Sequence, residues 1–129
     1  MGLGGFAAVG VGAALGAWMR WGLGVLFNPI VPALPLGTLA ANLIGGYLMG
    51  LALGAFLTGN AGLSPEMRLF VTTGFLGGLT TFSTFSAEAV SLLSRGEYGW
   101  ASLHLLGHVV GSLLMTGLGL LTIQVLQGR

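Results

Sequence analysis

Four long apolar stretches, separated by prolines and short polar connections, dominate this chain. All four prolines, at positions 29, 32, 35 and 65, fall between these stretches. Because a helix needs about 20 apolar residues to cross a bilayer, we place membrane-spanning helices at 3–27, 37–58, 66–94 and 99–127. The sequence therefore predicts an all-α integral membrane protein in which residues 1–129 form a single four-helix transmembrane domain.

Composition narrows the possible functions. Only 5% of the 129 residues are charged, against about 25% in soluble domains, so no soluble domain is expected and membrane lipid is the expected surrounding. The formal charge of +1 provides no basic face for nucleic acid, and the absence of cysteine excludes disulfides and thiolate metal sites. The first apolar stretch lacks a basic leader and a convincing cleavage site, so we expect it to be retained as a helix.

The few arginines leave the orientation in the membrane undecided. Four spans place Arg68 and Arg129 on one side and Arg20 and Arg95 on the other, so the positive charge that normally fixes orientation is balanced. One interpretation is that the chain inserts both ways and pairs as an antiparallel homodimer. The other is that so few charges leave the rule uninformative.

Glycines recur every four residues on three of the predicted helices. They lie at 12 and 16, at 46, 50 and 54, and at 107 and 111. Such spacing lets helix backbones approach closely, either within one subunit or at a dimer interface. The pattern alone leaves both arrangements open.

The sequence GFLGGLTTFSTFS at positions 74–86 places glycines and hydroxyls inside an apolar segment. Exposed peptide groups are tolerated at membrane depth only where protein or water satisfies them. We therefore predict a broken third helix that lines an ion route. The break would free backbone carbonyls, which are suitable ligands for a hard cation such as sodium.

Polar side chains on the second and fourth helices are candidates for contact with an ion. Asn42 lies inside an apolar helix, where it either bonds a neighbouring helix or donates to a permeating anion. His104, His108, Ser112 and Thr116 recur at intervals of four and form one polar stripe. The histidines could instead be neutral packing residues.

The third helix adds an aromatic pair and a carboxylate. Phe82 and Phe85 share one face, and their positive ring edges could stabilise a small anion, although such a pair is usually core. Glu88 is expected to be paired or hydrated, with Thr84 one turn away as a possible partner. Arg20, between two tryptophans, either extends to the interface or concentrates anions in a vestibule.

Taken together, these motifs resemble the small bacterial fluoride channels of the Fluc or CrcB type over essentially the whole chain. The strongest match is the segment at 74–86. It is supported by GAWMRW at 16–21, GTLAAN at 37–42 and GSLLMTG at 111–117.

The resemblance implies an antiparallel dual-topology homodimer in the bacterial inner membrane, with two fluoride pores and passive export instead of enzymatic turnover. It also implies a central structural sodium ion, held by the backbone carbonyls of Gly77 and Thr80, and no organic cofactor. The positions implied for the fluoride pore are Asn42, Phe82, Ser83, Thr84, Phe85, Glu88, His108, Ser112 and Thr116. Arg20 and Thr38 are assigned to a vestibule.

Three other functions compete with this interpretation. A proton-coupled small multidrug transporter would need an acidic residue in its first helix, whereas the first acid here is Glu66. A non-transporting membrane assembly protein would use the polar residues for packing alone. A proton-coupled fluoride antiporter would differ from a channel because its flux would depend on a proton gradient.

Overall fold

The computed structural model describes residues 2–57 and 62–128, and within them every regular element is helical. Three helices are long: α1 (Leu3–Phe27), α2 (Leu36–Leu57) and α6 (Tyr98–Leu126). Between α2 and α6 lie four shorter pieces, which are α3 (Pro65–Leu69), the π-helical segment η1 (Phe70–Leu76), α4 (Gly77–Leu79) and α5 (Phe82–Ser94). The last residue of the predicted span 37–58 lies outside the described residues.

Local sequence explains where several helices begin and end. Ser64 caps α3 by accepting a hydrogen bond from Met67 N–H at 3.1 Å, and Pro65 occupies the first turn, where a missing N–H costs nothing. α5 ends at a turn in which Gly96 has a φ of 72° and Glu97 N–H donates to Leu92 O. Glycine adopts this left-handed conformation without steric cost. The chain thereby reverses between α5 and α6.

Regular helix stops at Leu79 and resumes at Phe82. Thr80 and Thr81 have extended backbone, with ψ values of 154° and 119°. Thr81 caps α5, since its side chain accepts a hydrogen bond from Thr84 N–H at 3.1 Å. A hydroxyl residue that bonds locally in this way competes with helical hydrogen bonding, so the interruption has a local cause.

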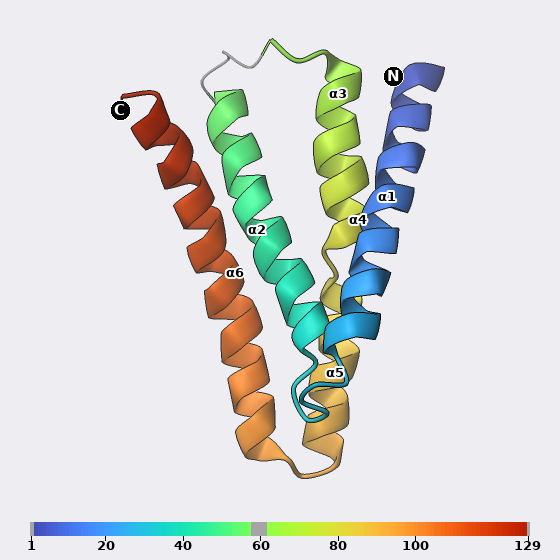
Figure 1. Ribbon diagram of the computed structural model, residues 1–129, viewed down its shortest axis with the longest axis vertical. Coiled ribbons are helices and arrows are strands. Elements are labelled where there is room, and N and C mark those ends of the chain that lie inside the picture. Colours follow the sequence, from blue (N-terminus) through green and yellow to red (C-terminus); the bar gives the residue numbers. More distant parts are fainter. Residues whose placement is uncertain (1, 58–61, 129) are drawn as a thin grey trace.

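The helices run alternately up and down, and both ends of the chain lie at the same end of the molecule (Figure 1). α2 packs along α6, and α1 packs along η1 and α4. Ala41 on α2, Leu76 at the end of η1 and Leu79 on α4 form the buried core. The interruption at Thr80 and Thr81 consequently lies next to the core, in the middle of the bundle.

Glycines on α1 and α2 allow the close packing within this single chain. A Cβ at Gly16 would collide with Phe75 O, and a Cβ at Gly50 would collide with Thr116 O. The glycines at 12, 46, 54 and 111 also face neighbouring elements of the same chain. Packing within one subunit is therefore the role that the structure gives these stripes.

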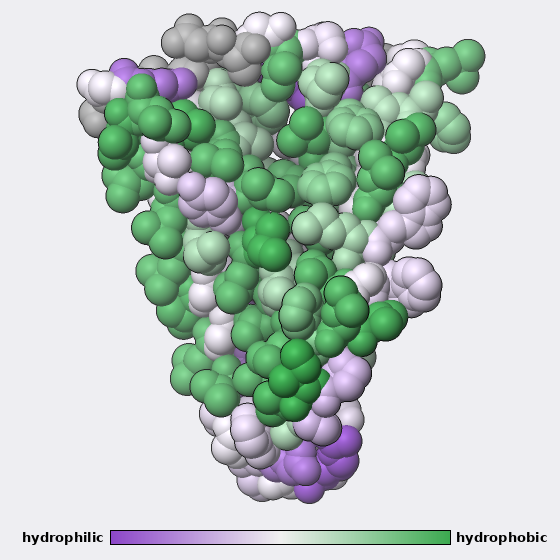
Figure 2. All heavy atoms as spheres, in the orientation of Figure 1, coloured by the Kyte–Doolittle hydropathy of each residue, from purple (hydrophilic) through white to green (hydrophobic). Residues whose placement is uncertain are grey.

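Apolar residues cover most of the visible face, whereas hydrophilic residues gather at its two ends (Figure 2). α1, α6 and residues Leu36–Phe56 of α2 are each long and apolar enough to cross a membrane. The expected all-helical, membrane-spanning class is confirmed. The predicted span 66–94 is divided among α3, η1, α4 and α5.

Candidate functional site

The side chain of Asn42 on α2 holds the peptide groups of Thr81. Asn42 Oδ1 accepts from Thr81 N–H at 2.8 Å, and Asn42 Nδ2 donates to Thr81 O at 3.0 Å. Because a peptide N–H can only donate, this contact fixes which amide atom is oxygen. Asn42 therefore supplies hydrogen-bond partners to peptide groups of Thr81, which lies outside regular helix.

The second hydrogen of the Asn42 amide is directed at His108. Asn42 Nδ2 lies 3.0 Å from His108 Nδ1, and because the amide nitrogen is the donor, Nδ1 must accept. The neutral ring then carries its proton on Nε2. Since both amide hydrogens are engaged, a permeating anion would have to compete with Thr81 or His108 for them.

Phe85 lies at the centre of a cluster of rings. Its ring centroid is 5.6 Å from that of Phe82 in an edge-to-face arrangement, 5.1 Å from that of His104 and 4.6 Å from that of His108. Phe85 is buried, but Phe82 is 77% exposed in the single chain. Phe85 thus belongs to the core, whereas the ring of Phe82 is free to contact a group outside the chain.

Glu88 on α5 joins three helices. Its Oε2 accepts from Thr38 Oγ1 on α2 at 2.7 Å, and its Oε1 lies 3.5 Å from His104 Nε2 on α6. The expectation that Glu88 is paired agrees with this geometry, although its hydrogen-bond partner is Thr38 and not the suggested Thr84.

Arg20 and Asn28 each bond backbone groups of another element. Arg20 Nε donates to Gly78 O at 3.0 Å, so this side chain reaches inward from α1. Asn28 Oδ1 accepts from Gly37 N–H at 2.7 Å and from Thr38 N–H at 3.1 Å, and so caps α2. Asn28 was not singled out from the sequence; its place immediately before Pro29, in a connection between helices, was the available signal.

A cavity of about 430 Å³, here called the Asn42 cavity, opens between α2, α5 and α6. Six of the predicted pore residues line it, namely Asn42, Phe82, Phe85, His108, Ser112 and Thr116. Thr116 Oγ1 also bonds back to Ser112 O at 2.9 Å. The α6 stripe is therefore divided: His104 is fully buried, and the other three members face the cavity.

Two further cavities hold most of the remaining candidates. The Arg20 cavity, about 310 Å³, is lined by Arg20, Thr38 and Thr84, and the Glu88 cavity, about 330 Å³, by Glu88 and Thr84. Thr81 lines both the Asn42 and Arg20 cavities, and Thr84 lines both the Arg20 and Glu88 cavities. Thr81 is absent from the predicted pore residues, although it belongs to the motif at 74–86.

Three predicted residues take other positions. Ser83 is exposed, lies 3.4 Å from Thr81 through the two hydroxyl oxygens, and lines none of these three cavities. Thr80 lines the Asn42 cavity, and its hydroxyl donates to Leu76 O at 2.8 Å. Gly77 is exposed at the start of α4.

The fold and the site define a class: multi-pass helical membrane proteins whose polar groups lie in cavities between the helices. Within this class, the chain belongs to the CrcB family, since the model described as "CrcB-like protein, Camphor Resistance (CrcB)" matches residues 7–120. The resemblance inferred from the motifs is thereby confirmed.

Similar proteins cover nearly the whole chain. The proteins named "Fluoride-specific ion channel FluC" from Cupriavidus necator and Cupriavidus taiwanensis are 68% and 67% identical to it over 122 residues, which are 95% of this chain and 96% of each relative. A protein of the same name from Nitrosospira multiformis is 60% identical over 124 residues, or 96% of both chains. These relatives are named as channels, in agreement with the prediction that the chain is not an enzyme.

Proposed function

We propose that this protein is a fluoride-selective passive ion channel that exports fluoride across the bacterial inner membrane. The observation that carries the proposal is the high identity, over nearly the full length, to proteins named as fluoride-specific ion channels. The arrangement of polar and aromatic groups around Asn42 supports it.

The lining of the Asn42 cavity suits a small anion. It offers the hydroxyl group of Ser112 and the ring of Phe82, and beside them lie His108 and Thr116, whose hydroxyl donates to Ser112 O. Donors and positive ring edges can replace part of the hydration shell of fluoride without a permanent charge that would hold it. A conducting site must bind an ion strongly enough to admit it and weakly enough to release it.

A route between the three cavities is the second part of the proposal. Thr81 lines both the Asn42 and Arg20 cavities and Thr84 lines both the Arg20 and Glu88 cavities, so these two residues would connect the route. Arg20 would raise the local anion concentration at one end, with Thr38 beside it. Ser83 would join the route only if an adjoining subunit covers it.

The third span and the assembly complete the proposed architecture. We propose that α3, η1, α4 and α5 together cross the membrane as one interrupted helix, so that residues 1–129 form a single four-helix domain. Two such chains would pair in antiparallel orientation and form two pores. The balanced arginines and the exposed ring of Phe82, beside an open cavity, support this pairing.

A structural sodium ion at the interruption fits the residues present. Thr81 N–H, which would bond Gly77 O in an uninterrupted helix, donates to Asn42 Oδ1, and Thr84 N–H, which would bond Thr80 O, donates to Thr81 Oγ1. Gly77 O and Thr80 O thus lose their helical donors, and carbonyl oxygens are good ligands for hard cations. When bound, sodium would supply positive charge that holds the interrupted segments of two subunits together.

Fluoride efflux from liposomes tests the proposal. Vesicles that contain the purified protein are loaded with fluoride or with chloride, and loss of each anion is followed with no proton gradient imposed. We expect rapid loss of fluoride and negligible loss of chloride. Retention of fluoride by vesicles that contain folded protein would contradict the proposal and favour an assembly protein. Fluoride loss only with an imposed proton gradient would indicate an antiporter.

A further inference from the structure

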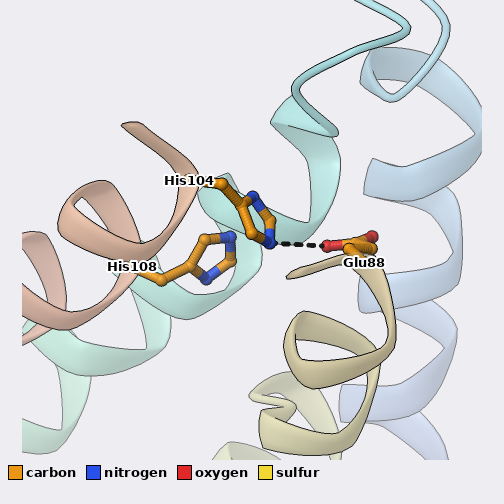
Figure 3. A group of neighbouring side chains, drawn as sticks. All are labelled: Glu88, His104 and His108. Atoms are coloured by element: carbon orange, nitrogen blue, oxygen red, sulfur yellow. Dashed lines mark ion pairs between the residues drawn. The ribbon is translucent and has the colours of Figure 1, made fainter. Parts of the chain in front are cut away.

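Glu88, His104 and His108 form a compact group of potential metal ligands between α5 and α6 (Figure 3). One ligand atom from each residue can be chosen so that all three lie within 4.8 Å of one another. The two histidines are four residues apart and so lie on one face of α6. Both rings are almost fully buried, at 0% and 3% exposed.

Each member of this group keeps a buried polar atom without a hydrogen-bond partner among the described residues. These atoms are Glu88 Oε1, His104 Nδ1 and His108 Nε2. Leaving such groups unpaired costs free energy. Glu88 Oε1 and His104 Nε2, at 3.5 Å, are too far apart for a good hydrogen bond. His104 Nε2 also lies 3.4 Å from Phe85 O, so a metal at this nitrogen would replace that contact. The packing of the helices thus brings Glu88 Oε1 and His108 Nε2, which have no partner among the described residues, close to His104.

We propose that Glu88, His104 and His108 bind a divalent first-row transition metal ion of the zinc type. Two imidazoles and one carboxylate suit zinc better than calcium or magnesium, which prefer oxygen ligands. The ligand atoms must move closer together to reach bonding distance. Of the three ligands only Glu88 lines the Glu88 cavity, which extends to Arg95 near the α5–α6 turn, so an ion would approach from the carboxylate side.

Asn42 opposes binding at this site. His108 Nδ1 accepts a hydrogen bond from Asn42, so its remaining ligand atom, Nε2, carries the ring proton. A metal at Nε2 needs a lone pair there, and the proton must then move to Nδ1, where it meets the Asn42 NH2 group. Binding therefore disturbs the contacts between Asn42 and Thr81. An aspartate at position 42 would instead accept from Nδ1–H, as carboxylates do behind metal-bound histidines.

Titration of the purified full-length protein with Co²⁺ and Zn²⁺ tests the site. The protein carries no polyhistidine tag, because a tag would bind these metals itself and the chain has only two histidines of its own. We expect one ion per chain, with Co²⁺ absorption typical of tetrahedral coordination that Zn²⁺ abolishes. His104→Gln and His108→Ser should each lower the affinity about tenfold or more. The control Glu97→Gln, which changes an acid outside the group, should not.

Asn42→Asp distinguishes the proposed site from non-specific binding of the metal to a histidine. Non-specific binding would not change in affinity with the residue at position 42. We expect this change to raise the affinity about tenfold or more. Unchanged affinity in Asn42→Asp would overturn the assignment of Nε2 as the ligand atom. Equal affinity in the wild type and in either histidine variant, or no binding by folded wild-type protein, would overturn the site itself.

Discussion

Asn42 and Glu88 each connect elements that are far apart in the sequence through partly buried hydrogen bonds. Asn42 holds Thr81 from 39 residues away, and Thr38 holds Glu88 from 50 residues away. The sequence predicted that both Asn42 and Glu88 need partners, because unpaired polar groups are costly in hydrocarbon. It could not identify those partners, since nothing local links position 42 to 81 or 38 to 88.

Asn42→Ala should lower the free energy of unfolding by about 1–3 kcal/mol, because the N–H and C=O of Thr81 lose their partners. The free energy of unfolding is measured in detergent from the loss of the helical circular dichroism signal on heating or with added denaturant. Ser94→Ala removes only a local bond to Ser91 O at an exposed site and serves as the control. Equal stability of the two variants would show that the Thr81 peptide is satisfied in another way.

Thr38→Val keeps the shape of the side chain but removes the hydroxyl that donates to Glu88 at 2.7 Å. A hydrogen bond to a charged group contributes about 1.5–3 kcal/mol, so we expect a loss of this order in the same unfolding assay. Thr72→Val, which removes only a bond to Arg68 O on its own turn, is the matched control. A loss no larger than that of the control would mean that Glu88 is held mainly by other groups.

The two phenylalanines should respond differently to the same change. Phe85→Ile should impair both stability and fluoride efflux, because Phe85 is buried among three rings. Phe82→Ile should impair efflux with little effect on the fold of the single chain, since Phe82 is 77% exposed. Stability in detergent and efflux from liposomes are measured for both. Wild-type efflux in both variants would refute a role of ring edges in passage.

At the scale of helices, tight packing along α1 and α2 depends on glycine. The recurrence of glycine at every fourth position predicted close approach of helix backbones. It could not indicate whether the partner helix belongs to the same chain. The structure places η1 and α4 against α1, and α6 against α2. The extended conformation between α4 and α5 has a local cause in the sequence, which is the hydroxyl of Thr81. The π-helical geometry of η1, in contrast, is not indicated by any pattern in the sequence.

Two glycines of α1 offer a matched comparison. Gly16→Ala should destabilise the protein by about 1–3 kcal/mol, because the new Cβ would collide with Phe75 O. The new Cβ of Gly22→Ala meets no atom of the described residues within 4 Å, so this change should stabilise the helix by about 0.5–1 kcal/mol. Unfolding in detergent measures both. Equal effects of the two changes would show that α1 does not pack this closely on η1 and α4.

At the scale of the whole molecule, hydropathy predicted the class and the motifs predicted the family, and both are confirmed. Hydropathy suffices for the class because backbone in a bilayer must satisfy its own hydrogen bonds, which leaves few alternatives to helices. The assembly is different, since an interface between copies leaves no decisive mark on one chain. Antiparallel pairing, the two pores and the sodium ion stay predictions.

Labelling of a single introduced cysteine tests the orientation of the chain, which has no native cysteine. Ser94→Cys places an exposed thiol at the end of α5. If both orientations coexist, a membrane-impermeant thiol reagent should label about half of the protein in intact spheroplasts and all of it after permeabilisation. Labelling that is complete or absent in intact spheroplasts would contradict dual topology.

Passive passage of fluoride through the protein is the property on which the proposed function depends. The most direct measurement is the reversal potential of the current across a planar bilayer that contains the purified protein, under a fluoride gradient with chloride present. We expect the current to reverse at the fluoride equilibrium potential, and an added pH gradient should leave this reversal potential unchanged. A reversal potential that follows chloride would contradict selectivity, and one that shifts with the pH gradient would contradict passive conduction.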